Sequence, residues 1–214
     1  MHAIQMVDLK RQYLKIKDEI DQGILEVLDT TAYINGPKVK AFQEGLQQYL
    51  STAHVIPCAN GTDALTLAML GLGLERGDSI LVPANDGGYA ALAALRVGLI
   101  PQPMDVDAAT GLVGIAQVKS AWKACQARAL VITHLHGRVT PLDDIDRWRK
   151  NHGLLLIEDC AQAFGAELHG VKVGAWGDIG CFSLQQGKHI TTGEGGLVTS
   201  NDPDLARPAG RTVA

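Results

Sequence analysis

The sequence predicts an α/β domain with a mostly parallel sheet between layers of helices. The main observation is that short apolar runs alternate with amphipathic segments over most of the chain; strands that alternate with helices are typical of parallel sheets. The 214 residues are 46% hydrophobic, which allows a sizeable core, and a chain of this size buries roughly 70% of its unfolded surface. The sequence has no internal repeat and no low-complexity linker, so one large domain is the simplest organisation.

The first two predicted elements are helices. Residues 8–28 carry apolar side chains at near-helical spacing and are expected to form an amphipathic helix. Residues 31–39 contain Asn-Gly-Pro, which is a turn signal, and residues 38–51 are expected to form a second helix.

Strands and helices then follow in alternation. The predicted strands are 55–58, 79–83, a short strand near 101–105, 130–135, 154–159, 179–184 and 196–200. The predicted helices between them are 62–70, 89–98, one near 114–126, and 142–151. The last residues, RPAGRTVA, have no apolar periodicity, so 207–214 is predicted to be a disordered tail.

Composition and charge argue against several classes of function. The net charge is −4 with no basic stripe, so no nucleic-acid partner is expected. The first twenty residues are charged throughout, unlike a signal peptide or a membrane span. The scattered cysteines are typical of reduced thiols rather than of a disulfide framework. We therefore expect a soluble cytoplasmic protein that does not bind membranes. The four cysteines are Cys58, Cys125, Cys160 and Cys181.

A first polar cluster follows the strand at 55–58. Asn60, Gly61, Thr62 and Asp63 lie where a helix begins. Small residues let backbone N–H groups approach an anion, and a helix N-terminus favours negative charge, so a phosphate would fit here. A simple helix cap by Thr62 or Asn60 remains the alternative.

Two further clusters follow predicted strands. Glu158 and Asp159 end an apolar strand, and a carboxylate there is costly unless it meets a cation or several donors. Ser183 lies near the end of another predicted strand, and Lys188 follows that strand and precedes three glycines within four residues. Turn capping by the carboxylates and an ordinary surface lysine are the alternatives. Ligands of open α/β sheets bind at the carboxyl ends of strands, where all these groups are expected.

Together the three clusters provide the groups that pyridoxal 5'-phosphate requires. Lys188 would bond to the aldehyde of the cofactor, and the strand-end carboxylate would keep the pyridine nitrogen protonated. Thr62 and Ser183 would hold the phosphate.

A metal site is a weaker alternative: His134 and His136 alternate on one strand and could bind a metal with Cys160 or Glu158. We predict no metal.

Five motifs then resemble the DegT/StrS sugar aminotransferases, a family of fold type I pyridoxal-phosphate enzymes. They occur in family order and spacing, and the similarity runs from about residue 4 to 206. The resemblance implies a seven-stranded-type sheet, as in the large domain of these enzymes. The motifs are NGTDAL (60–65), HLHG (134–137), IEDCAQAFGA (157–166), GDIGCFSL (177–184) and KHITTGEGG (188–196).

The resemblance also implies roles for individual residues. Lys188 matches the catalytic lysine, and Asp159 matches the partner of the pyridine nitrogen. Gln162 matches the residue near the phenolic oxygen of the cofactor. The expected phosphate ligands are Thr62, Ser183 and the backbone of Gly61.

The chain departs from the family pattern at the predicted strand 79–83. Family members carry an aromatic residue soon after it, stacked on the pyridine ring. Here Gly87 occupies that position, and Tyr89 follows two residues later. Since residues two apart on an extended segment share a face, Tyr89 is a candidate to stack on the ring instead.

The chain also lacks the C-terminal half of family members. Residues 1–206 match the large domain with its N-terminal helical segment, and the small domain is absent. The chain could be a natural half, a truncated form or a remnant. Fold type I enzymes build active sites between subunits, so the resemblance implies a homodimer, or a heteromer with a second chain that supplies the missing half.

The activity that the resemblance implies is transamination. An amino group would pass from glutamate or glutamine to a keto sugar or keto-cyclitol, in amino-sugar or secondary-metabolite biosynthesis. The alternative is a non-catalytic or regulatory subunit that keeps the fold and acts by pairing with a partner chain.

Overall fold

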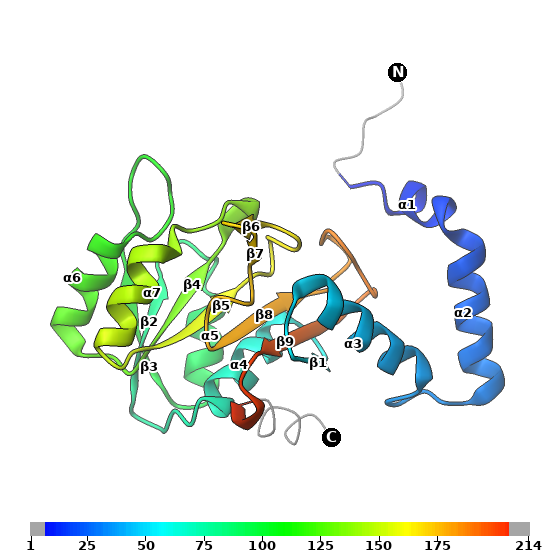
Figure 1. The fold of residues 1–214 in the computed structure, drawn as a ribbon, viewed down its shortest axis with the longest axis horizontal. Coiled ribbons are helices and arrows are strands. Elements are labelled where there is room, and N and C mark those ends of the chain that lie inside the picture. Colours follow the sequence, from blue (N-terminus) through cyan, green and yellow to red (C-terminus); the bar gives the residue numbers. More distant parts are fainter. Residues whose placement is uncertain (1–6, 206–214) are drawn as a thin grey trace. The chain divides into compact units, whose positions relative to one another are not determined.

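The computed structural model describes residues 7–205 (Figure 1). They fall into two compact units, one up to Gly45 and one from Leu46 onward. The tail predicted at 207–214 lies outside the described residues.

The first unit is helical. It holds α1 (Leu9–Lys15), α2 (Lys17–Thr30) and most of α3 (Pro37–Leu50). The prediction of one helix over residues 8–28 is wrong, because Ile16 has non-helical angles (φ −128°, ψ 24°). Its N–H donates to the carbonyl of Tyr13, three residues earlier, and this tighter turn separates α1 from α2.

The second unit contains a seven-stranded sheet, as the resemblance implied. Its strand order is β1-β9-β8-β5-β4-β2-β3. All neighbouring pairs are parallel except those of β9, which runs antiparallel to both β1 and β8. The strands are β1 (His54–Cys58), β2 (Ser79–Pro83), β3 (Ile100–Met104), β4 (Ala129–Thr133), β5 (Leu155–Asp159), β8 (Ile179–Ser183) and β9 (Gly196–Ser200).

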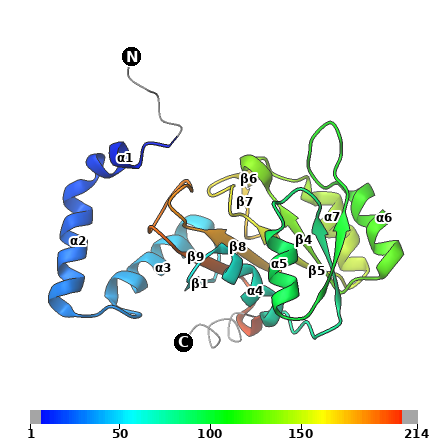
Figure 2. The same cartoon turned by 180° about the vertical axis from the view of Figure 1, so that it is seen from behind.

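Helices cover both faces of this sheet, as predicted. Alternate residues of a strand point to opposite faces, so Ile80 and Leu81 of β2 belong to two different apolar clusters. The first cluster includes α4 (Gly61–Gly71) and α5 (Tyr89–Arg96). The second includes α6 (Ile115–Cys125) and α7 (Leu142–Asn151). Figure 2 shows the side of the sheet that α5 covers.

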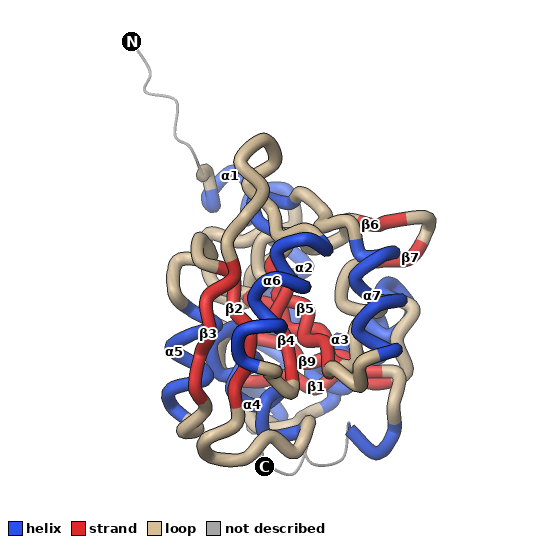
Figure 3. The backbone as a smooth tube through the Cα atoms, turned by 90° about the vertical axis from the view of Figure 1, so that its left-hand side faces the viewer, coloured by secondary structure: helices blue, strands red, loops and turns tan. Residues whose placement is uncertain are grey.

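The second unit therefore has three layers, with the sheet between two layers of helices (Figure 3). Three short elements were not predicted: the 3-10 turn η1 (Leu135–Gly137) and the two-stranded ribbon of β6 (Glu167–Leu168) and β7 (Val171–Lys172). The strand predicted at 130–135 ends at Thr133, because His134 leaves the extended conformation (φ −83°, ψ 72°). No helix among residues 7–205 is both long and apolar enough to cross a membrane.

The parallel strands bring chemically useful residues to one edge of the sheet. Thr133 and Asp159 are direct neighbours at the ends of β4 and β5, and Asp159 pairs in turn with Cys181 of β8. The carboxyl ends of β2, β4, β5 and β8 therefore meet along this edge, where the sequence predicted a ligand site.

Candidate active site

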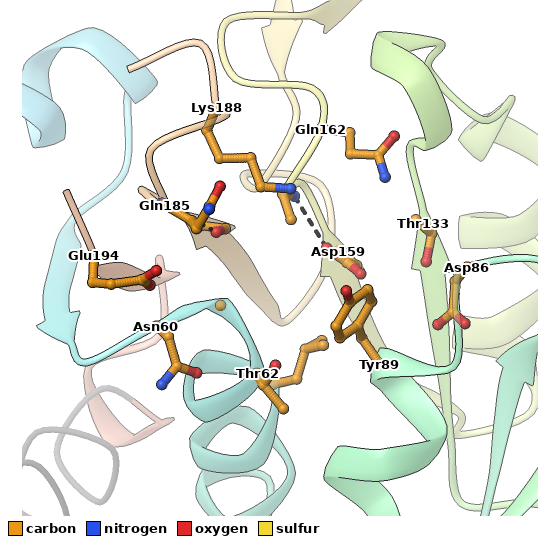
Figure 4. Close-up of a pocket in the computed structure, with 14 residues that line it drawn as sticks. Asn60, Thr62, Asp86, Tyr89, Thr133, Asp159, Gln162, Gln185, Lys188 and Glu194 are labelled. Atoms are coloured by element: carbon orange, nitrogen blue, oxygen red, sulfur yellow. Dashed lines mark hydrogen bonds between the residues drawn. The ribbon is translucent and has the colours of Figure 1, made fainter. Parts of the chain in front are cut away.

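A cavity of about 370 Å³ lies at the carboxyl ends of the strands. Every residue that the sequence nominated for catalysis or cofactor binding lines it (Figure 4). These residues are Gly61, Thr62, Tyr89, Asp159, Gln162, Ser183 and Lys188.

One side of the cavity is the N-terminus of α4. Asn60 caps this helix, since its Oδ1 accepts a hydrogen bond from the Asp63 N–H at 2.8 Å. The first N–H groups of a helix have no partner within the helix, so those of Gly61 and Thr62 are suited to an anion. The capping role and the anion site, which the sequence left as alternatives, are therefore compatible.

Gly61 is needed for this arrangement. A Cβ atom on Gly61 would lie 2.8 Å from the Cβ of Ser183, which is closer than real Cβ contacts come. Only glycine thus lets the start of α4 approach the end of β8 so closely. The hydroxyl of Ser183 and the helix N-terminus then line the same cradle.

Asp159 lies at the end of β5 and is only 5% exposed. Its carboxylate accepts one hydrogen bond, from the Ala161 N–H at 3.0 Å. Burial raises the pKa of Asp159 and the negative charge of Asp86 adds to this, while the Lys188 amine counteracts it. No cation forms an ion pair with Asp159 among the described residues. A cationic ligand in the cavity would therefore stabilise the charged form.

Lys188 extends into the cavity from the loop that joins β8 to β9 (Figure 4). The loop is held at its base, where the Leu184 N–H donates to the Gly195 carbonyl at 2.8 Å. The Lys188 N–H donates to the Gln185 carbonyl at 2.9 Å. These bonds fix the backbone of a half-buried lysine whose amine faces the cavity.

Tyr89 is the first residue of α5, and its side chain lines the cavity (Figure 4). Gly87 and Gly88 precede it with φ of +80° and +83°, in the left-handed region that favours glycine. A Cβ on Gly87 would lie 3.2 Å from the Tyr89 ring. The glycine that stands in the place of the family aromatic residue therefore leaves room for Tyr89.

Gln162 is held by the turn that follows β4. Its Oε1 accepts a hydrogen bond from the His136 N–H at 2.9 Å. The side-chain amide therefore has one end fixed, and its NH₂ group remains available as a donor.

The sequence did not identify several residues that line the cavity. Asp86 is 5% exposed and Thr133 is 8% exposed. The Oγ1 atom of Thr133 is buried and has no hydrogen-bond partner in the part of the chain that the structure describes. Gln185 and Glu194 also line the cavity, from the loop that carries Lys188. The position of Thr133 at the end of β4 could have indicated this residue, whereas Asp86 precedes two glycines in a loop and looks like an ordinary turn residue.

Glu158, next to Asp159, is fully buried and accepts hydrogen bonds on both oxygens. The N–H groups of Trp176 and Gly177 donate to Oε1 at 2.8 and 2.7 Å, and that of Gly174 donates to Oε2 at 3.0 Å. Several hydrogen-bond donors therefore offset the cost of burying this strand-end carboxylate, as the sequence analysis required.

His134 completes these contacts. The Thr140 N–H donates to its Nδ1 at 3.1 Å, so the ring hydrogen is on Nε2, which lies 3.0 Å from Glu158 Oε2. Cys160 lies near both groups, and burial raises the pKa of its thiol well above the usual range. His134 and Glu158 are thus already engaged in hydrogen bonds beside a buried thiol, so the burial of this group of side chains is explained without a metal. His136 is not part of the group.

Known proteins resemble this chain over most of its length. The model of the DegT/DnrJ/EryC1/StrS aminotransferase family matches residues 14–211. UDP-N-acetyl-3-dehydro-alpha-D-glucosamine 3-aminotransferase of Acidithiobacillus ferrooxidans is 38% identical over 96% of this chain and 56% of its own length. L-glutamine:2-deoxy-scyllo-inosose aminotransferase of Streptomyces paromomycinus is 39% identical over 78% of this chain and 39% of its own length.

A solved structure also matches the fold of this chain. S. venezuelae DesV in complex with a ketimine intermediate superposes with a TM-score of 0.93 at 33% identity, over 98% of this chain and 57% of DesV. The chain thus spans about half the length of the curated relatives it matches.

Proposed function

Since this chain belongs to the DegT/DnrJ/EryC1/StrS aminotransferase family, we propose that it is a pyridoxal-phosphate-dependent transaminase or the N-terminal part of one. The amino donor is glutamate or glutamine. The acceptor is a keto sugar or a keto-cyclitol, the two substrate classes that the names of the relatives indicate.

The observation that carries the proposal is that Asp159 and Lys188 line the same cavity. A buried carboxylate with one hydrogen bond and no ion pair among the described residues would be stabilised in its charged form by a cation, and a protonated pyridine nitrogen is one. Across the cavity, the start of α4 and Ser183 form a cradle suited to a phosphate. The residues present therefore fit pyridoxal 5'-phosphate.

The bound cofactor supplies an electron sink for the electron pair that is released when a substrate C–H bond breaks. Asp159 would hold the proton on the ring nitrogen, and Lys188 would hold the cofactor through its Nζ. Once an amino donor frees it, the Lys188 amine would be the general base and acid placed to move a proton. Gln162 would be the hydrogen-bond donor near the phenolic oxygen, and Tyr89 would cover a face of the ring.

The family resemblance supports an assembly of two or more chains, either a homodimer or a heteromer with a second chain. The second candidate function is a non-catalytic or regulatory subunit that keeps the fold and acts by pairing with a partner chain. We assign the protein to the cytoplasm on the basis of its composition.

An absorbance titration tests the transaminase. Pyridoxal 5'-phosphate added to the chain should give a band near the visible edge that borohydride removes, and glutamate or glutamine should bleach it. Lys188→Ala should abolish the borohydride-sensitive band, whereas Lys119→Ala on the exposed side of α6 should retain it. A band in the Lys188→Ala variant would contradict the site. A band that neither amino acid bleaches, with the chain alone or with a partner chain, would favour the non-catalytic subunit.

A further inference from the structure

The cavity contains a second buried carboxylate besides Asp159. Asp86, in the loop after β2, is 5% exposed and lines the same cavity (Figure 4). It forms no ion pair within residues 7–205. Two buried carboxylates at one site repel each other unless a cation or a proton lies between them.

Asp86 also holds the turn that leads to Tyr89. Its Oδ1 accepts from the Gly88 N–H at 2.7 Å and its Oδ2 accepts from the Ala90 N–H at 3.2 Å. Gly88, the N-cap residue of α5, has no side chain, so Asp86 provides the cap from two residues upstream. Both oxygens are anchored by backbone donors, and this fixes the place of the negative charge in the wall of the cavity.

The charges around Asp86 come from several elements. Asp159 of β5 is the nearby anion, and its pKa rises through the charge of Asp86. Lys188, from the loop after β8, is the cation of the cavity, and Tyr89 contributes a phenol. His134 after β4 is hydrogen bonded to Glu158 and to the Thr140 N–H and does not line the cavity, although its charge acts against the rise in the pKa of Asp159. The Asp159 end of the cavity therefore holds two carboxylates.

We propose that Asp86 is a further positioning residue, whose fixed negative charge acts with Asp159 to select a ligand with a cationic ring nitrogen, and whose hydrogen bonds place Tyr89 in the cavity. This inference rests on the proposed function. It adds a residue that neither the motifs nor the family resemblance nominated.

The test uses two probes: pyridoxal 5'-phosphate, and its 1-deaza analogue, in which carbon replaces the ring nitrogen. Both can bond to Lys188, but only the first becomes a ring cation. Dissociation constants for both are measured on the cofactor-free chain, by absorbance titration between pH 6 and 9. The ratio of the two constants reports selection for the ring cation and is insensitive to a general loss of structure.

Asp86→Asn keeps an oxygen that can cap the turn and removes the charge. We expect it to lower the preference for pyridoxal phosphate over the analogue by about tenfold at neutral pH, which corresponds to about one pKa unit of charge interaction. Asp86→Glu keeps the charge but lengthens the cap, so it should retain most of the preference. Asp107→Asn is the matched control, because Asp107 also accepts two backbone N–H groups of a turn but lies outside the cavity.

The outcomes separate this inference from the proposed function. Asp159→Asn should reduce the preference further than Asp86→Asn, and if it has no effect, the ring-nitrogen assignment itself fails. If Asp159→Asn reduces the preference and Asp86→Asn does not, only the role of Asp86 is overturned. Equal weakening of both probes by Asp86→Asn would reduce its role to capping α5 and would also overturn the proposed charge selection.

Discussion

At the residue scale, the site combines one rigid and one extended side chain. Asp159 is the last residue of a buried strand, so its carboxylate has little freedom to move. Lys188 comes from a loop and reaches the same cavity with a long side chain. The sequence could predict both, because each follows an apolar run. Asp86 escaped prediction, since a loop aspartate before two glycines is an ordinary turn signal and its burial depends on the fold.

Asp159→Asn should stabilise the cofactor-free chain. Because the pKa of Asp159 is raised in the folded state, its contribution to stability is fully present below the unfolded pKa of about 3.9 and is lost as pH rises through the folded value. Melting temperatures of wild type and variant should therefore coincide near pH 4 and differ near pH 8. We expect the variant to melt at least about 2 °C higher there, since about 1 kcal/mol shifts a domain of this size by 2–4 °C.

The same variant should bind pyridoxal phosphate more weakly than wild type. Asp144→Asn is the control for the melting experiment, since the Asp144–Arg147 ion pair is exposed and should contribute little to stability. If Asp159→Asn melts lower than wild type at pH 8, the burial cost assigned to this carboxylate is wrong.

At the element scale, contact between α4 and β8 forms the cradle that we propose for a phosphate. The contact depends on a glycine at the first position of α4, opposite Ser183. The sequence predicted the helix and the strand from periodicity but could not show their approach, which links residues more than a hundred positions apart. The break at Ile16 also had no signal, because the apolar spacing continues across it.

Gly61→Ala should disrupt the cradle. The added Cβ would lie 2.8 Å from the Cβ of Ser183, and forcing α4 and β8 apart should cost about 1–3 kcal/mol. We expect a lower melting temperature and a loss of affinity for pyridoxal phosphate that exceeds the loss for pyridoxal, which lacks the phosphate.

Gly45→Ala provides the comparison, because a Cβ there meets no atom within 4 Å and alanine favours a helix. It should be neutral or stabilising. Equal loss of affinity for both ligands in Gly61→Ala would indicate general damage rather than a phosphate contact.

At the scale of the whole molecule, the order of strands accounts for most of the prolines in the sheet. The edge strands β1 and β3 contain Pro57, Pro101 and Pro103, as expected where one side of a strand needs no ladder partner. The remaining strand proline, Pro83, is the last residue of the inner strand β2. Strand β9 lies between two neighbours and is fully buried. Alternation of strands and helices predicted the parallel part of the sheet, but apolar runs carry no direction, so the reversed β9 could not be foreseen.

Val198→Pro should therefore prevent stable folding of the second unit. Val198 pairs with Ile56 and Cys181, so a proline removes a ladder donor in mid-sheet, where proline is essentially not found, and the buried carbonyl left unpaired costs about 1–3 kcal/mol more. Val198→Ala separates the backbone effect from the loss of packing. Urea unfolding followed by circular dichroism should show an alanine variant that is folded but weaker, whereas a folded proline variant would contradict the central position of β9.

The place of β9 also has a consequence for biosynthesis. Strand β1 can pair only with β9, which leaves the ribosome roughly 140 residues later, and at about 5–20 residues per second this interval lasts roughly 7–28 s. During this interval β1 has no strand partner, so the nascent chain exposes a strand edge that is partly apolar. Chaperone capture during translation is thus expected to matter more for this protein than for one whose neighbouring strands are made consecutively.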